Sequence, residues 1–160
     1  MKKLLLTILV LLNLSVHSIA QQQYSTELIS TNVKGTDNPS DWQLYFDNQE
    51  IKIEYKFVDC DPVSGMDNES VLLRFTNNSS NKLLVSWHLH LSYDGTCRTC
   101  DYPEEYGYEM SIEPNEVIEG DCDDEEGYKV KIFSKFIDEN YSKGAQLTAF
   151  QLANLEIIQF

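Results

Sequence analysis

Four cysteines are the residues of this sequence with the most evident chemistry, and two of them form the motif Cys97-Arg98-Thr99-Cys100. The other two are Cys60 and Cys122. Cysteines at these spacings are typical of three kinds of site: a thiol–disulfide redox centre, a zinc site, or a pair of structural disulfides.

The residues after the motif disfavour the two reactive interpretations. A redox thiol needs a lowered pKa, which a helix N-terminus or basic neighbours provide. Three acidic residues follow the motif and outnumber the one arginine within it: Asp101, Glu104 and Glu105. A zinc site made from all four thiolates would compete with their oxidation, and only one pair has ligand spacing. We therefore expect two disulfides, with a Cys97/Cys100 redox centre and a zinc site as less favoured alternatives.

Carboxylates gather in three short segments near the cysteines. The first contains Asp59, Asp61, Asp67 and Glu69, the second Asp94, Asp101, Glu104 and Glu105, and the third Asp121, Asp123, Asp124, Glu125 and Glu126. Ca²⁺ takes six to eight oxygen ligands, and the first ligand candidates are Asp121, Asp123 and Asp124, with Asp59 or Asp61 from the neighbouring loop. The third segment does not match a helix–loop–helix calcium loop, because Glu126 stands where that loop has glycine. A solvated acidic surface is the simpler interpretation, and a basic protein partner is the other alternative.

The pair His88 and His90 is a second candidate metal site. Alternate residues of a strand point to the same face, so both imidazoles would lie side by side and could bind one Cu²⁺ or Zn²⁺ ion. No third ligand is evident, and two exposed histidines on the outer face of a sheet are the commoner outcome.

The first twenty residues have the organisation of a secretory signal peptide. Lys2 and Lys3 precede the apolar run Leu4–Leu12, and Ser18-Ile19-Ala20 supplies small residues at the expected cleavage point. The apolar run is shorter than the roughly 20 residues that a membrane span requires. We expect a secreted or periplasmic protein in an oxidising compartment, without stable membrane insertion.

Net charge narrows the classes of partner. The whole chain carries 12 basic and 26 acidic residues; loss of Lys2 and Lys3 with the leader leaves 10 against 26, a net charge of −16. Such a charge repels nucleic acid and anionic lipid. We expect no nucleic-acid partner, and we expect an unknown protein or a cation to bind at the acidic loops.

Short apolar segments separated by turn residues follow a polar lead-in, which spans residues 21–41 and is expected to be flexible or loosely attached. Strands are predicted at 42–46, 51–58, 71–76, 83–93, 108–112, 116–121, 128–136 and 147–158. Eight strands without a helix of any length predict a single antiparallel β-sandwich domain over residues 42–160.

The strand tryptophan Trp87 and the hairpin Ser111-Ile112-Glu113-Pro114-Asn115-Glu116 resemble the immunoglobulin-like and fibronectin type III class of sandwich. From Ile51 onward the chain also resembles small secreted β-sandwich proteins of unknown function from Gram-negative bacteria. It departs from true immunoglobulins because their Cys-Trp-Cys spacing is missing. The resemblance implies an immunoglobulin-like sandwich and carries no catalytic signature.

Strand direction predicts where the cysteines meet. If consecutive strands reverse direction, then Cys60, Cys97, Cys100 and Cys122 all reach one end of the sandwich, together with the three acidic segments. A Cys97–Cys100 bridge would close a very small ring and constrain little. We therefore favour Cys60–Cys100 with Cys97–Cys122, followed by Cys60–Cys97 with Cys100–Cys122.

These observations predict a secreted, non-enzymatic binding or scaffolding module with an acidic loop end tied by disulfides. The sequence contains no nucleophile elbow and no zinc-protease helix, and both histidines of the mature chain lie in one strand. No cofactor is expected. The alternative is a metal-binding domain, with calcium at the acidic loops or copper or zinc at His88 and His90; a redox protein using Cys97 and Cys100 comes third.

Overall fold

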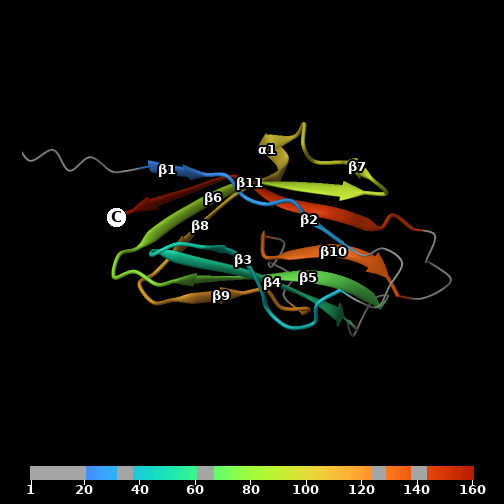
Figure 1. Cartoon of the computed structure of the whole chain (residues 1–160), viewed down its shortest axis with the longest axis horizontal. Coiled ribbons are helices and arrows are strands. Elements are labelled where there is room, and N and C mark those ends of the chain that lie inside the picture. Colours follow the sequence, from blue (N-terminus) through green and yellow to red (C-terminus); the bar gives the residue numbers. More distant parts are fainter. Residues whose placement is uncertain (1–20, 32–37, 61–66, 124–128, 138–143) are drawn as a thin grey trace, which may run out of the picture.

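The computed structural model describes residues 21–31, 38–60, 67–123, 129–137 and 144–160. Within these residues two antiparallel sheets pack face to face, one above the other in Figure 1. Sheet A consists of β1 (Gln21–Tyr24), β2 (Ile29–Ser30), β6 (Leu83–Tyr93), β7 (Thr96–Cys97), β8 (Gly107–Ile112) and β11 (Leu147–Gln159). Sheet B consists of β3 (Gln43–Asp47), β4 (Ile51–Cys60), β5 (Asn68–Asn77), β9 (Val117–Glu119) and β10 (Lys131–Phe136). The predicted all-β sandwich is confirmed.

Alternation of apolar and polar side chains produces the two layers. Along β4 and β5, every second residue enters the core between the sheets, because successive strand side chains point to opposite faces. The core contributed by the four longest strands contains Ile51, Ile53, Phe57, Val71, Leu73, Phe75, Leu83, Val85, Trp87, Leu89, Leu147, Phe150, Leu152, Leu155 and Ile157. Trp87 of sheet A stacks on Phe75 of sheet B with ring centroids 5.1 Å apart. This aromatic pair joins the two layers.

Seven of the eight predicted strands correspond closely to observed ones, and the eighth, 116–121, is reduced to the three residues of β9. The predicted reversal of direction also holds where it was used: β4 is antiparallel to β5, β6 to β8, and β5 to β9. Figure 1 shows β4 and β6 pointing to the same end of the molecule from different layers. We call this end the loop end.

β9 and β10 run along the same neighbour. Both pair with β5, β9 opposite Arg74–Thr76 and β10 opposite Asn68–Leu72, and both are antiparallel to it. The connection from β9 to β10 therefore begins and ends beside β5, and its described part includes Asp121, Cys122 and Asp123.

The segment predicted as a flexible lead-in differs from that expectation in its described part. β1 pairs with β11 from Gln21↔Ile158 to Tyr24↔Leu155, and β2 pairs with β11 at Ala149 and Phe150. The Tyr45 hydroxyl also donates to the carbonyl of Glu27, 3.0 Å away. Polar composition concealed these strands because their side chains lie at the exposed edge of sheet A. One short helix, α1 (Pro103–Tyr106), belongs to the described residues, and none of their helices is long and apolar enough to cross a membrane.

Candidate functional site

Both disulfides differ from the predicted pairings. Cys60 bonds to Cys122, and Cys97 bonds to Cys100. The favoured pairing, Cys60–Cys100 with Cys97–Cys122, is therefore wrong, and so is its runner-up. The two bridges involve different sheets, since Cys60 ends β4 of sheet B while Cys97 lies in β7 of sheet A.

A tight hairpin turn explains the error. Asp94 and Gly95 both adopt positive φ, 51° and 79°, as the two-residue turns that join antiparallel strands require. The turn sends the chain back along β6, so that Cys97 pairs with Ser92. Cys97 and Cys100 thus stay beside sheet A. The Asp-Gly dipeptide is a hairpin signal in the sequence, but the predicted strands 83–93 and 108–112 leave no strand between them.

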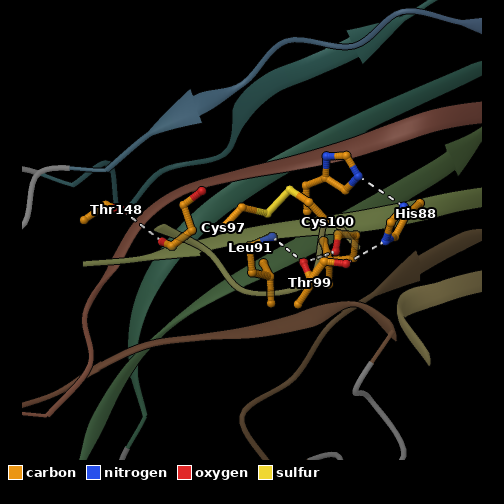
Figure 2. The surroundings of a disulfide bond; sticks show 9 residues. His88, Leu91, Cys97, Thr99, Cys100 and Thr148 are labelled. Atoms are coloured by element: carbon orange, nitrogen blue, oxygen red, sulfur yellow. Dashed lines mark hydrogen bonds between the residues drawn. A yellow bond between two sulfur atoms is a disulfide. The ribbon is translucent and has the colours of Figure 1, made fainter. Parts of the chain in front are cut away.

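The Cys97–Cys100 ring seats Thr99 against β6, as Figure 2 shows. The Thr99 hydroxyl donates to the carbonyl of Leu89 at 2.7 Å and accepts from the amide of Leu91 at 2.8 Å. The amide of Arg98 donates to the carbonyl of Leu91, also at 2.8 Å. β7 ends opposite Ser92 and β8 begins opposite His88, so the ring lies along the stretch of the β6 edge between these two residues.

His88 and His90 lie on the outer face of β6, as predicted, but His88 is buried rather than exposed, and the two rings bind each other. His88 is buried and its Nε2 lies 3.0 Å from the carbonyl oxygen of Thr99, so Nε2 carries the proton and donates. His88 Nδ1 then accepts from Nε2 of His90 at 3.1 Å. Burial, and then the proximity of His88, lower the pKa of His90. One ring nitrogen of the pair, Nδ1 of His90, is left for a metal, so this arrangement does not preorganise a two-imidazole chelate.

Neither cysteine of the motif lies in the first turn of a helix. α1 begins at Pro103, beyond Cys100, and its first turn contains Glu104 and Glu105. The geometry therefore lacks the helix N-terminus that would lower the pKa of a redox thiol.

The structure describes three of the five predicted calcium ligands. Asp59, Asp121 and Asp123 are exposed, and the Asp123 amide donates to Oδ1 of Asp121 at 3.2 Å. Asp61 and Asp124 lie outside the described residues. Among the described residues, no group of three histidine, cysteine or acidic side chains is close enough to hold a metal ion.

Three charged side chains form a row across sheet B at the loop end. Asp59 of β4 is directly opposite Glu69 of β5, and Glu69 is directly opposite Lys135 of β10. Asp59 follows the core residue Phe57 by two positions, and Glu69 precedes the core residue Val71 by two positions. The row is therefore in phase with the apolar inner face of the sheet, where a sandwich normally places hydrophobic residues.

A β-bulge brings Lys135 into this row. Alternation along 129–135 would place Lys129, Lys131 and Lys135 on one face, but the pairing of β10 shifts register between Phe133 and Lys135. The extra residue is Ser134, which is buried. Bulges re-aim the side chains that follow them, and this one directs Lys135 toward Glu69 instead of toward the outer face.

Glu69 is held in place by hydrogen bonds to one of its two oxygens. Oε1 accepts from the Ser134 hydroxyl at 2.8 Å and from the Asn38 amide at 3.1 Å. Oε2 lies 3.6 Å from Nζ of Lys135, which is close enough for an ion pair but longer than a hydrogen bond. The Glu69 side chain is only 10% exposed, so this carboxylate is largely removed from water.

The charged row lines a cavity of about 690 Å³. Its walls combine the three charges with apolar and neutral polar groups, namely Phe57, Val58, Phe136, Ile137, Asn38, Ser40 and Gln146. This volume lies within the range of small-molecule sites in proteins, about 300–1,000 Å³. We call this cavity the end pocket.

A second cluster of charged side chains, on the outer face of sheet B, differs from the end pocket because its charges are paired. The Arg74 guanidinium donates through Nε and Nη2 to Oε2 of Glu54, at 2.9 and 2.8 Å, and Lys52 lies 3.2 Å from the same oxygen. Burial alone would raise the pKa of Glu54, but the bonds from Arg74 and Lys52 outweigh it and hold this pKa below its ordinary value. Arg74 also lies over the Trp42 ring, 4.2 Å from its centroid. Every charge in this cluster has a close partner, whereas the end pocket has more acids than bases.

The sequence identified Asp59 and Glu69 as members of an acidic segment but did not predict that they face a cavity with Lys135. The second acidic segment divides: Asp94 belongs to the β6–β7 turn, while Glu104 and Glu105 belong to α1, over sheet A in Figure 1. Comparison of the chain with protein-family models, with curated proteins and with solved structures found no match. The end pocket is therefore assigned as the candidate site on its geometry alone.

Proposed function

We propose that this chain is a non-enzymatic binding module of an oxidising extracytoplasmic compartment, secreted or periplasmic, and that it binds its partner at the end pocket. Two disulfides within a chain of this size support the compartment, because disulfides persist where thiols are oxidised. The immunoglobulin-like class of the sandwich belongs to the same proposal and rests on the sequence resemblance.

The observation that carries the proposal is the charged row at inner-face positions. Charged groups removed from water cost free energy unless they are paired and hydrogen-bonded. An apolar residue at the largely buried position of Glu69 would extend the core and stabilise the sandwich more simply. The presence of the charged row around an open cavity supports a role in binding, since ligand pockets combine apolar walls with a few convergent polar groups.

Binding is favoured over catalysis because the described residues that line the pocket include no histidine. His88 and His90, which would be the usual proton-transfer groups, lie on the outer face of the other sheet and bind each other.

The test is a ligand screen monitored by ¹⁵N–¹H NMR, using a fragment library with equal numbers of cationic, anionic and neutral compounds. Ser40→Trp places a bulky side chain at an exposed residue that lines the pocket, and Ser80→Trp is the matched control in an exposed turn elsewhere. We expect ligands that shift the amides of the pocket residues in the wild type and in Ser80→Trp, but not in Ser40→Trp. A screen in which no compound shifts these amides, or in which Ser40→Trp binds as well as the wild type, contradicts the proposal.

A further inference from the structure

We infer that the end pocket is a site for a primary ammonium group carried on an apolar body, which binds between Asp59 and Glu69. This inference rests on the proposed function, because it names the class of ligand for the same pocket. It is carried by the pairing of charges across the sheet, by an oxygen without a hydrogen bond, and by the apolar walls.

The charged row contains more negative than positive charge. Asp59 and Glu69 are directly opposite on neighbouring antiparallel strands, and like charges in that arrangement destabilise a sheet. Lys135 is opposite Glu69 on the other side and supplies one positive charge for two negative ones. A bound cation between the two carboxylates would complete the alternation of charge and relieve the repulsion.

Carboxylate oxygens of Glu69 and Asp59 that face the pocket lack hydrogen bonds within the described part of the chain. Oε1 of Glu69 has two donors, but Oε2 has no hydrogen bond from any described residue, and its ion pair with Lys135 spans 3.6 Å. The Asp59 side chain, which is exposed, makes neither a hydrogen bond nor an ion pair with a described residue, and it lines the pocket. A free acceptor is unusual on the largely buried Glu69, because buried polar groups are nearly always hydrogen-bonded. An ammonium has three donors and could bond to both carboxylates at once.

The apolar walls and the volume of the end pocket favour an organic cation. Phe57, Val58, Phe136 and Ile137 line the cavity, and Ile137 is 43% exposed, although it is a large apolar residue. A cavity of about 690 Å³ is much larger than a metal ion, and Ca²⁺ requires six to eight oxygens, whereas the described residues bring no three metal-binding groups together. A primary ammonium also fits two carboxylates from different strands better than a guanidinium, whose planar fork matches a single carboxylate.

The probe is 2-phenylethylammonium, titrated into ¹⁵N-labelled protein at neutral pH and low salt. 2-Phenylethanol and 3-phenylpropanoate, which have similar shapes and different charges, are the ligand controls. We expect saturable shifts at Asp59, Glu69 and Ile137 with the ammonium, binding at least about tenfold weaker with the alcohol, and none with the carboxylate. A lysine-containing tripeptide with blocked termini distinguishes the sources: tighter binding than the amine indicates a lysine side chain of a protein partner, and weaker binding indicates a small amine.

Variants of the row should change the affinity in opposite directions. Glu69→Gln should weaken binding of the ammonium about tenfold, because it removes the charge but keeps the shape. Lys135→Gln should strengthen it severalfold, because Lys135 competes for the same oxygen. Asp59→Asn, at an exposed position, tests the inference if Glu69→Gln fails to fold, and Asp47→Asn in β3 is the matched control that should leave affinity unchanged.

Two results separate the inference from the proposed function. If neutral or anionic compounds bind at the same amides as tightly as the ammonium, or if the charge variants leave its affinity unchanged, the ammonium inference is overturned while the binding module stands. If no compound in the screen shifts the pocket amides, both are overturned.

Discussion

Removing the Cys60–Cys122 bridge should cost the fold more than twice the free energy that is lost with the Cys97–Cys100 bridge. The first bridge joins residues 62 apart in the sequence and the second joins residues 3 apart. Closing a loop of n residues removes about 2.1 + 1.5R ln n cal/mol/K from the entropy of the unfolded chain. At 25 °C this relation gives about 4 kcal/mol for the long loop and less than about 2 kcal/mol for the short one.

The assay compares urea unfolding of the double variants Cys60→Ala/Cys122→Ala and Cys97→Ala/Cys100→Ala with the wild type, monitored by tryptophan fluorescence. The variant without the long-range bridge should also show a larger m-value, because its unfolded chain exposes more surface. An equal or larger loss in the Cys97→Ala/Cys100→Ala variant would refute the loop-length reasoning.

Three further predictions concern single residues. Asn77→Ala should lower the free energy of unfolding in urea by about 2–4 kcal/mol, because the buried Asn77 amide donates to three backbone carbonyls. Asn78→Ala in the exposed turn is the control and should change it by less than about 0.5 kcal/mol. Gly120→Ala should destabilise the protein by about 1–3 kcal/mol, because the added Cβ would lie 2.4 Å from the carbonyl oxygen of Val130. Full stability in thermal melting would show that the backbone at Gly120 and Val130 moves apart to make room. Glu54→Gln should be less stable than the wild type at neutral pH, because it removes the charge that Arg74 and Lys52 stabilise. This difference in stability should shrink as the pH falls below about 4.3, the unfolded pKa, toward the lowered pKa of the folded state. A difference that is independent of pH in acid unfolding would contradict the assignment of these ion pairs.

The strands were predictable because their side chains alternate. Ile51, Ile53 and Phe57 face the core while lysine and glutamate lie between them, and this pattern identified both the strand and its inner face. Direction reversal then brought Cys60 correctly to the loop end. β1 was missed because an edge strand of glutamines has no apolar face to reveal it.

The candidate site was predicted only in part, for a different physical reason. Asp59 and Glu69 stood out by charge, but their relation to Lys135 depends on the bulge at Ser134, and one inserted residue reverses the face of every side chain that follows it. The disulfide pairing depended in the same way on two backbone residues with positive φ, Asp94 and Gly95. Such local features of the backbone leave little trace in a pattern of hydrophobicity.

The small Cys97–Cys100 ring has a consequence that loop-closure entropy does not measure. An open stretch of strand edge is a template on which another chain adds a strand, and aggregation commonly starts there. Thr99 and Arg98 already occupy the backbone groups of Leu89 and Leu91 on the β6 edge. By keeping this ring closed, the bridge should limit strand addition by a second copy at this edge, although it adds little to the stability of the single molecule.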